Sequence, residues 1–397
     1  MSKEKATNKK NKAFKYRIYP TKNQEIYLIN VFGCCRFIYN YALGDSISLY
    51  ESTKDTENPE YFSYGKYADK LKPMKQTDEY SFLKKVDSTA LQQALRHLDT
   101  AFQRFYKKNS DFPKFKAKRN KQSCTITSSA IEVGDNYIRI PKAGNIKAII
   151  HRKAPKDYVL KSFTLSMEKD GSFYCSCLYE YEPKEKPSEE ITSIDGLKVV
   201  GLDYKSDGFY VSSDGDIKGS PKYFRKSADK LAREQKRLSK KIGYKKGEPK
   251  SKNFLKQQIK VNKIYRHIAN QRLDFANKTS TEIANQYDIV CVETLNLRNM
   301  SNKGFGNGKA TLDNVYGMFL DKLKYKLEDR SKAFVKVDKF FASSQTCSCC
   351  KNKQKMPLKI RTYNCPICGN TIDRDLNAAI NIKNEGVRIF KEELNLA

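Results

Sequence analysis

Four cysteines near the end of the chain have the spacing of a metal site. Cys347 and Cys350 form one Cys-x2-Cys pair, Cys365 and Cys368 form a second, and the central gap gives Cys-x2-Cys-x14-Cys-x2-Cys. Two thiolates at this spacing bind one ion through a tight turn, and four thiolates leave a tetrahedral zinc ion no open position for water. The pattern therefore predicts one structural zinc ion. The alternatives are four buried thiols without a metal, or Cys349 in place of Cys350.

Three acidic residues also stand where chemistry could occur. Asp203 ends an apolar run, Glu293 ends another, and Asp375 opens a helical pattern. Carboxylates that converge from several elements can hold two divalent cations ~4 Å apart, which activate water and stabilise the leaving oxygen in phosphodiester hydrolysis. A lone Asp at a strand end is more often a cap or turn residue, so the prediction depends on the set. Together with the cysteines, this order favours a nuclease over a simple nucleic-acid binder.

Composition supports a nucleic-acid partner. The formal net charge is +31, from 76 Lys and Arg against 45 Asp and Glu in 397 residues. A charge this large is best explained by a polyanionic partner, although a basic surface that only aids solubility is the alternative. Eleven cysteines of uneven spacing favour a reducing cytoplasm over a disulfide framework. We expect no membrane helix, because no run of about 18 apolar residues occurs.

Periodicity in the second half of the chain predicts strands that alternate with helices. Strands are expected at residues 197–203, 209–213, 288–293 and 333–338, and helices at 219–286 with a break at 243–250, at 314–330 and from about Asp375 onward. This alternation is typical of an α/β domain. The acidic residues then lie at strand ends and at a helix start.

In the first half of the chain, the spacing of apolar residues changes from a strand pattern to a helical pattern and back again. Residues 13–19 read as a strand, Thr21 to Gln24 has capping-box form, and residues 87–102 carry an amphipathic helical pattern. Strand patterns return at residues 123–138, 140–150 and 160–181. We expect these strands and the first one to form one barrel, with the helices inserted between them. Residues 1–12 read as a disordered basic arm, and 183–190 as a charged linker.

Two basic segments are candidate nucleic-acid contacts. Residues 112–121 interleave aromatic and cationic side chains, and a basic helical region follows later. Such cations neutralise phosphates without reading sequence, although an ordinary solvated helix face is the alternative. The candidates are Lys114, Lys116, Lys118, Arg119, Lys236, Arg237, Lys240 and Lys241. Tyr50, Tyr61, Tyr64 and Tyr67 could stack on bases, but tyrosines are more often core or rim residues.

Several segments resemble the TnpB family. The specific ones are residues 200–203 (Val-Gly-Leu-Asp), 292–296 (Val-Glu-Thr-Leu-Asn), 343–350 (Ser-Ser-Gln-Thr-Cys-Ser-Cys-Cys) and 373–382 (Asp-Arg-Asp-Leu-Asn-Ala-Ala-Ile-Asn-Ile). Residues 16–24, 32–42 and 112–118 also resemble it, so the likeness runs nearly end to end. This family consists of RNA-guided nucleases encoded by insertion sequences and related to the compact type V CRISPR effectors.

The resemblance implies a multidomain α+β fold. It comprises an N-terminal wedge β-barrel with an inserted helical recognition domain, and a C-terminal RuvC or RNase-H-like α/β nuclease domain with a zinc-ribbon insertion. The implied boundaries are 1–12 for the arm, 13–20 and 112–182 for the wedge, 21–111 for the recognition helices, 183–196 for the linker, 197–342 and 371–397 for the nuclease, and 343–370 for the ribbon.

The resemblance also implies an activity and its residues. Asp203, Glu293 and Asp375 would bind two Mg²⁺ ions, with Asp373 a helix-entry residue. Arg272 could contact the scissile phosphate, or it could pair with Asp274. The implied partners are a guide RNA and target double-stranded DNA, with no membrane.

Two alternatives stay open: a compact type V CRISPR effector, and an RNA-guided repressor that does not cut. The chain departs from the usual family pattern at Tyr204 and Lys205 after the first acid, at Thr294 after the second, and at Lys351 after the first cysteine pair. None of these departures removes a proposed ligand.

Overall fold

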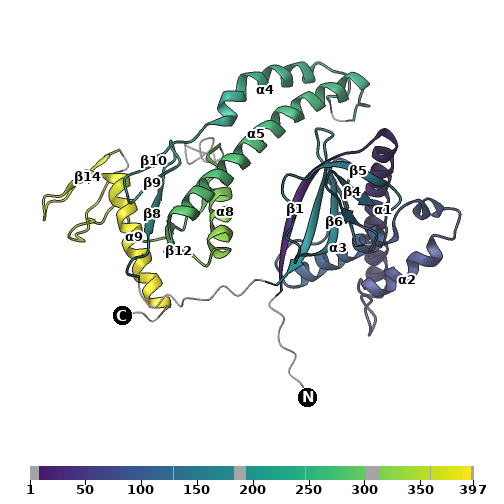
Figure 1. The fold of residues 1–397 in the computed structure, drawn as a ribbon. Coiled ribbons are helices and arrows are strands. Elements are labelled where there is room, and N and C mark those ends of the chain that lie inside the picture. The colour runs from purple at the N-terminus through teal and green to yellow at the C-terminus, as the bar shows by residue number, and fades with distance from the viewer. Residues whose placement is uncertain are drawn as a thin grey trace. The chain divides into compact units, whose positions relative to one another are not determined.

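Two units make up the chain. The computed structural model describes residues 9–127, 129–182, 194–245, 247–300, 313–357 and 359–394 (Figure 1). Its contacts divide into one unit of residues 1–184 and another of residues 185–397, and each unit is described by itself.

The first unit contains one antiparallel sheet of seven strands in the order β2-β6-β7-β1-β5-β4-β3. The strands are β1 Lys10–Tyr19, β2 Gln122–Ile126, β3 Glu132–Val133, β4 Tyr137–Ile140, β5 Gly144–Ile149, β6 Val159–Met167 and β7 Phe173–Tyr181. The first strand of the chain therefore pairs with strands from more than a hundred residues later. The described ladder ends at β2 and β3, so closure into a barrel stays a prediction.

The helices of this unit lie between β1 and β2 in the sequence, as predicted. They are α1 Lys22–Thr53, α2 Tyr64–Met74, the 3-10 helix Ser81–Lys85 and α3 Ser88–Tyr106. The capping box is confirmed, because the Thr21 side chain accepts from the Gln24 backbone and the Gln24 side chain accepts from the Thr21 N–H. Asp87 is the N-cap of α3, because its side chain accepts from the backbone N–H groups of Thr89 and Ala90.

Helix α1 has the length and apolar composition of a membrane span, alone among the helices within the described ranges. Its apolar side chains nevertheless pack in a core with α3 and the sheet; Leu28, Val31 and Ile38 are at most 1% exposed. No membrane helix was predicted. The one helix with that length and composition within the described ranges has its apolar face covered by other parts of the protein.

The second unit contains a mixed sheet of five strands in the order β10-β9-β8-β11-β12. These strands are β8 Val199–Tyr204, β9 Tyr210–Ser212, β10 Ile217–Lys218, β11 Ile289–Glu293 and β12 Ala333–Val337. Strands β8, β11 and β12 are parallel, whereas β9 and β10 form an antiparallel edge. The C-terminal ends of the three parallel strands therefore meet at one edge.

Helices cover both faces of this sheet. The described helices of this unit are α4 Tyr223–Ser239, which packs on α5, and α5 Lys252–Gln286, α6 Leu297–Met300, α8 Tyr316–Glu328 and α9 Arg374–Glu393. Helices α5 and α8 share a core with Val200, Leu202 and Val292, whereas α9 packs on the other face with Val199, Ile289 and Cys291. Figure 1 shows α9, in yellow, lying along the sheet on the side away from α5 and α8.

Two glycines allow α9 to approach the sheet closely. A Cβ on Gly201 would lie 2.2 Å from the carbonyl oxygen of Ala379, and one on Gly386 would lie 2.3 Å from the Cys291 Sγ. Neither distance is tolerable for real atoms, so these positions must lack a side chain. The middle of α9 is thereby fixed against β8 and β11.

Some local predictions were wrong or incomplete. Lys10–Lys12, predicted as part of a disordered arm, belong to β1 and pair with β7, while residues 1–8 lie outside the described residues. The strands β10, β13 (Thr362–Asn364) and β14 (Thr371–Asp373) were not predicted. They are only two or three residues long, which is too short for an alternation of apolar and polar residues to be recognised.

Candidate metal centres

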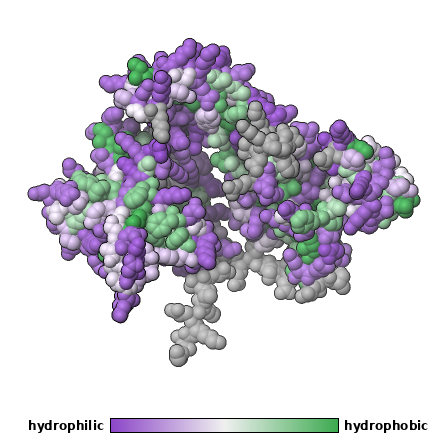
Figure 2. Space-filling view, turned by 180° about the vertical axis from the view of Figure 1, so that it is seen from behind, coloured by the Kyte–Doolittle hydropathy of each residue, from purple (hydrophilic) through white to green (hydrophobic). Residues whose placement is uncertain are grey.

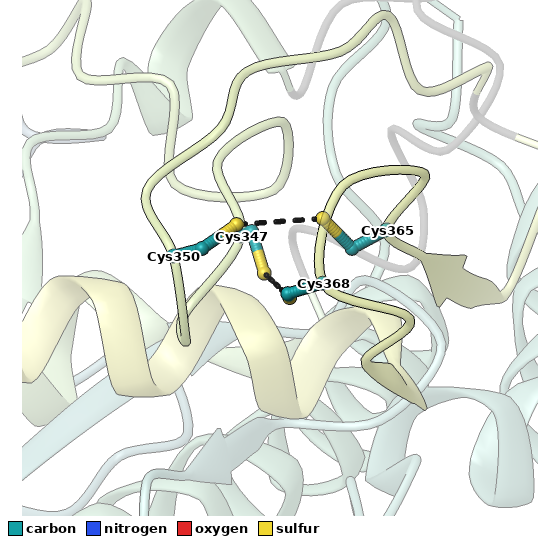
Figure 3. A group of neighbouring side chains, drawn as sticks. All are labelled: Cys347, Cys350, Cys365 and Cys368. Carbon is teal, nitrogen blue, oxygen red and sulfur yellow. Dashed lines mark hydrogen bonds between the residues drawn. The ribbon is translucent and has the colours of Figure 1, made fainter.

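The four predicted cysteines come together within the described part of the second unit. All four sulfur atoms lie within 4.8 Å of one another, with Cys347–Cys368 at 3.7 Å and Cys350–Cys365 at 3.5 Å (Figure 3). Four Zn–S bonds of about 2.3 Å in a tetrahedron require sulfur–sulfur distances of about 3.8 Å. The donor set and its size therefore fit one structural zinc ion, whereas Cys349 lies outside the cluster, exposed.

Local backbone geometry prepares the cluster for a cation. Burial opposes ionisation of Cys347, but hydrogen bonds from the backbone N–H groups of Cys350 and Cys349 outweigh it and lower the pKa of Cys347 to about 6. Both knuckles also close tightly, since Lys351 N–H bonds the Cys347 carbonyl and Gly369 N–H bonds the Cys365 carbonyl. A thiolate is the form that binds zinc, so these backbone hydrogen bonds favour the ligand state of Cys347, whereas the pKa of Cys368 is raised to about 12 beside the other thiols.

The first two acidic residues lie side by side at the ends of two parallel strands. Gly201 stands opposite Cys291 in the register, and Asp203 and Glu293 follow two residues later on each strand. Side chains two residues apart point to the same face of a strand. Asp203 and Glu293 therefore share the face that α9 covers.

Asp375 joins them from the first turn of α9. Asp373 is the N-cap of this helix, because its side chain accepts from the backbone N–H groups of Asp375 and Leu376. The prediction that Asp373 is a helix-entry residue is thus confirmed. Since the glycine contacts fix α9 against β8 and β11, the first turn carries Asp375 to the strand ends.

Electrostatic interactions connect the three carboxylates, although among the described residues the cysteines alone form a group whose ligand atoms lie within 4.8 Å of one another. Burial first, and then the charges of Glu293 and Asp375, raise the pKa of Asp203 well above its ordinary value. Burial also raises the pKa of Glu293, against a 2.6 Å hydrogen bond that the Ser343 hydroxyl donates to it. Buried Tyr316 is affected by the same carboxylates. Burial and then the charges of Asp203 and Glu293 raise its pKa.

Two cationic side chains contact the third carboxylate. Lys205 Nζ donates to Asp375 at 2.9 Å, and Arg361 Nη1 lies 3.8 Å from its other oxygen. Lys205 was noted in the sequence only as a departure from the family pattern, and nothing in the sequence pointed to Ser343 or Arg361 as neighbours of the acids. These contacts link distant segments, so spacing could not reveal them.

This donor set fits divalent magnesium. Carboxylate oxygens are hard ligands of the kind that Mg²⁺ prefers, and they come from three different elements. Burial is the largest cause of the raised pKa values of Asp203 and Glu293, and at Asp203 the charges of Glu293 and Asp375 add to it against those of Arg374 and Lys205. Cations bound between the carboxylates would remove this repulsion.

Arg272 has a buried carboxylate partner. Its guanidinium bonds Asp313 at 2.7 Å, and Asp313, only 1% exposed, also accepts from the backbone N–H of Phe224. The alternative of an Arg272–Asp274 ion pair is wrong, because Asp274 pairs with Lys278. Arg272 therefore ties α5 to the start of α4, and Asp313 was not foreseen as its partner.

Most of the predicted nucleic-acid contacts are exposed. The exposed ones are Lys114, Lys118, Arg119, Lys236, Arg237, Lys240 and Lys241. Lys116 is half-buried, with Nζ 3.7 Å from the centre of the Tyr39 ring, and Tyr67 is 5% exposed and cannot stack on a base. Figure 2 shows hydrophilic residues over most of the face in view.

Curated proteins similar to this chain are known from bacteria. A Streptomyces pristinaespiralis protein named "Putative RNA-guided DNA endonuclease" is 32% identical over 95% of this chain and 89% of its own length. The chain belongs to the TnpB family. InsQ of Escherichia coli (strain K12), with the same description, is 28% identical over 94% of this chain and 92% of its own length.

Family models match three segments, described as a helix-turn-helix domain (residues 8–55), a probable transposase (176–303) and a Cas12f1-like TNB domain (316–382). The fold is similar to that in a cryo-EM structure of a Cas12f1–sgRNA–target DNA complex. That match has a TM-score of 0.56, 13% identity, and covers 95% of this chain and 99% of the other. TnpB membership and the mixed α/β fold predicted from sequence are therefore confirmed.

Proposed function

We propose that this TnpB protein is an RNA-guided DNA endonuclease whose cleavage centre is formed by Asp203, Glu293 and Asp375. The observation that carries the proposal is the placement of these carboxylates at one sheet edge, where burial and then the charges of Glu293 and Asp375 raise the pKa of Asp203, and burial raises the pKa of Glu293. The order of the five-stranded sheet supports an RNase-H-like RuvC domain. The match to RNA-guided endonucleases supports the reaction.

The chain's own residues prepare the site in three ways. The parallel strands β8 and β11 present two of the carboxylates on one face, α9 brings the third, and Ser343 orients Glu293. Two bound Mg²⁺ ions would supply an activated water and stabilise the leaving 3′ oxygen of the DNA strand. Lys205, whose Nζ lies 2.9 Å from Asp375, would face a phosphate bound between the carboxylates.

The other parts of the chain have proposed roles in guidance. Residues 13–20 and 112–182 would act as the wedge, residues 21–111 as the recognition helices, and residues 343–370 as the ribbon that binds target nucleic acid. Guide RNA pairing would select the target DNA, while the protein reads only a short flanking motif and nucleic-acid shape. Exposed cations such as Lys118 and Lys240 would neutralise phosphates. We place this activity in a prokaryotic cytoplasm, on the DNA of a transposable element's host.

The test uses the protein purified with its RNA. Sequencing the copurified RNA is expected to give a discrete species, and the complex with Mg²⁺ should cut a matched DNA duplex that carries the flanking motif. Asp375→Asn and Glu293→Gln should each remove cleavage by at least about a hundredfold while RNA binding is kept, because each removes one oxygen ligand charge. Asp321→Asn, on an exposed residue of α8, is the matched control and should cut normally.

Two results would overturn the proposal. Normal cutting by Asp375→Asn and Glu293→Gln would show that the chemistry occurs elsewhere. A wild-type complex that binds its matched DNA but leaves it intact would instead make the chain an RNA-guided repressor.

A further inference from the structure

The Asn-Ala-Ala-Ile-Asn segment of α9 has a role that the cleavage chemistry does not use. Asn377 and Asn381 are 0% and 2% exposed, and both side chains bond the strand-to-ribbon segment formed by residues 342–348. A buried primary amide is costly unless its polar atoms are paired. These two amides are therefore paired by specific backbone groups of that one segment.

Asn377 connects α9 to the first zinc knuckle. Its Nδ2 donates to the Thr346 carbonyl at 2.8 Å, and its Oδ1 accepts from the Ser348 backbone N–H at 2.9 Å. Thr346 and Ser348 flank Cys347, so the two bonds fix the backbone on both sides of this zinc ligand. Figure 3 shows the cysteine cluster lying against the helix.

Asn381 continues the connection toward the carboxylates. Its Nδ2 donates to the Thr346 carbonyl at 2.6 Å and to the Ser343 carbonyl at 2.9 Å. The hydroxyl of Ser343 in turn bonds Glu293 Oε1 at 2.6 Å. Four residues separate Asn377 from Asn381, so both side chains lie on the same side of the helix.

We propose that Asn381, assisted by Asn377, couples zinc binding at the cysteine cluster to divalent-cation binding at the carboxylates. The proposal rests on the function proposed above. When zinc orders the Cys347 knuckle, the segment between Thr346 and Ser343 is held in place, and the Ser343 hydroxyl orients Glu293. Asn381 is thus a positioning residue, and the ribbon is a support for the cleavage centre as well as a proposed nucleic-acid contact.

Coupling of this kind can be measured, because each metal must change the affinity of the protein for the other by the same factor. If zinc at one site favours a cation at the other, loss of zinc must weaken that second site by the coupling factor, commonly 5- to 150-fold. We expect about a tenfold loss of Mn²⁺ affinity, because one ligand, Glu293, loses its orientation while Asp203 and Asp375 stay. Mn²⁺ is the probe, since it prefers oxygen ligands and can be followed by its magnetic resonance signal.

The experiment is a double-mutant cycle on the full chain without nucleic acid. One change removes zinc through the second knuckle, by Cys365→Ser together with Cys368→Ser, and it substitutes none of the residues that bond Asn377 and Asn381. The other change is Asn381→Ala. Each is expected to weaken Mn²⁺ binding about tenfold, and zinc loss should change the affinity less than about twofold once Asn381 is replaced. Metal analysis checks that Asn381→Ala still holds zinc.

Matched controls separate coupling from simple damage. Asn384→Ala, on an exposed position of the same helix, should bind Mn²⁺ as the wild type does. Ser343→Ala removes only the last bond of the connection, and in that background too zinc loss should leave the Mn²⁺ affinity nearly unchanged. Ser343→Ala decides the question if Asn381→Ala does not fold.

The outcomes distinguish this inference from the proposed function. If zinc loss weakens Mn²⁺ binding equally with and without Asn381, or does not weaken it at all, the coupling is overturned. Asp375→Asn tests the centre itself: wild-type Mn²⁺ affinity in that variant would overturn the proposed function instead.

Discussion

Replacing Asp203 by asparagine should make the protein more stable when divalent cations are absent. Asp203 is 9% exposed, and burial together with the charges of Glu293 and Asp375 raises its pKa. Asparagine has nearly the same shape without the charge. The variant therefore removes the unfavourable free energy of burying the Asp203 charge near two other carboxylates.

The pH dependence gives this prediction its magnitude. The folded-state pKa of Asp203 lies above the unfolded value of about 3.9, so the folded protein keeps a proton that the unfolded chain has lost. The free energy of unfolding then falls as pH rises between these two pKa values, by about 1.4 kcal/mol per pH unit for one group. Below the unfolded pKa the penalty is absent, and above the folded pKa it is constant. The advantage of Asp203→Asn should therefore begin near pH 4 and grow with that slope.

Calorimetry from about pH 5 to pH 8 can measure the difference. In this range the opposite contribution of carboxylates with lowered pKa values, such as Asp313 and Asp288, is nearly constant, because it is lost only at lower pH. With a chelator present, the unfolding transition of the second unit should occur at a higher temperature in Asp203→Asn. Saturating Mg²⁺ should raise that transition in the wild type and leave the variant unchanged.

Asp321→Asn is the control for a neutralised but exposed carboxylate, and it should match the wild type at every pH. Equal stability and equal pH slopes for Asp203→Asn and the wild type would refute the reasoning. They would mean that Asp203 is solvated and that the carboxylates do not repel one another.

Three further predictions concern the supports of the site. Cys365→Ser should abolish zinc binding and melt the ribbon, seen as lost zinc in metal analysis and as new proteolysis between residues 343 and 370; a protease-resistant ribbon without zinc would contradict it. Asp313→Asn should lower the free energy of unfolding by about 2 kcal/mol, because Arg272 loses a buried partner, and denaturant unfolding that matches the wild type would exclude that role. Gly201→Ala should cost about 3 kcal/mol and weaken Mn²⁺ binding, since the new Cβ would meet the Ala379 carbonyl and displace α9; unchanged affinity would show that α9 does not position the centre.

Local signals in the sequence predicted the individual elements well. The Thr21–Gln24 capping box is confirmed, because capping depends only on neighbouring residues. The strands that carry Asp203 and Glu293 near their C-terminal ends were predicted for a similar reason, since a short apolar run that stops at an acid is visible in the chain itself. The four cysteines were predicted from spacing alone.

Contacts between distant segments could not be predicted in this way. The Lys205–Asp375 pair joins residues 170 positions apart, and Asn381 bonds Ser343 across 38 positions. Their formation depends on how closely α9 packs on the sheet. Gly201 and Gly386 permit this close packing, but a glycine in the sequence does not by itself indicate it. Strand β1 began earlier than predicted for the same reason, because Lys10–Lys12 are ordered by pairing with β7 rather than by their own polar sequence.

The most direct test of the proposed cleavage centre is a crystal structure of the protein with its guide RNA, target DNA and Mn²⁺, collected at the manganese absorption edge. We predict two anomalous peaks about 4 Å apart, bounded by the carboxylates of Asp203, Glu293 and Asp375. An anomalous map without manganese between these carboxylates, from a complex that cuts DNA in the same Mn²⁺ solution, would contradict the account.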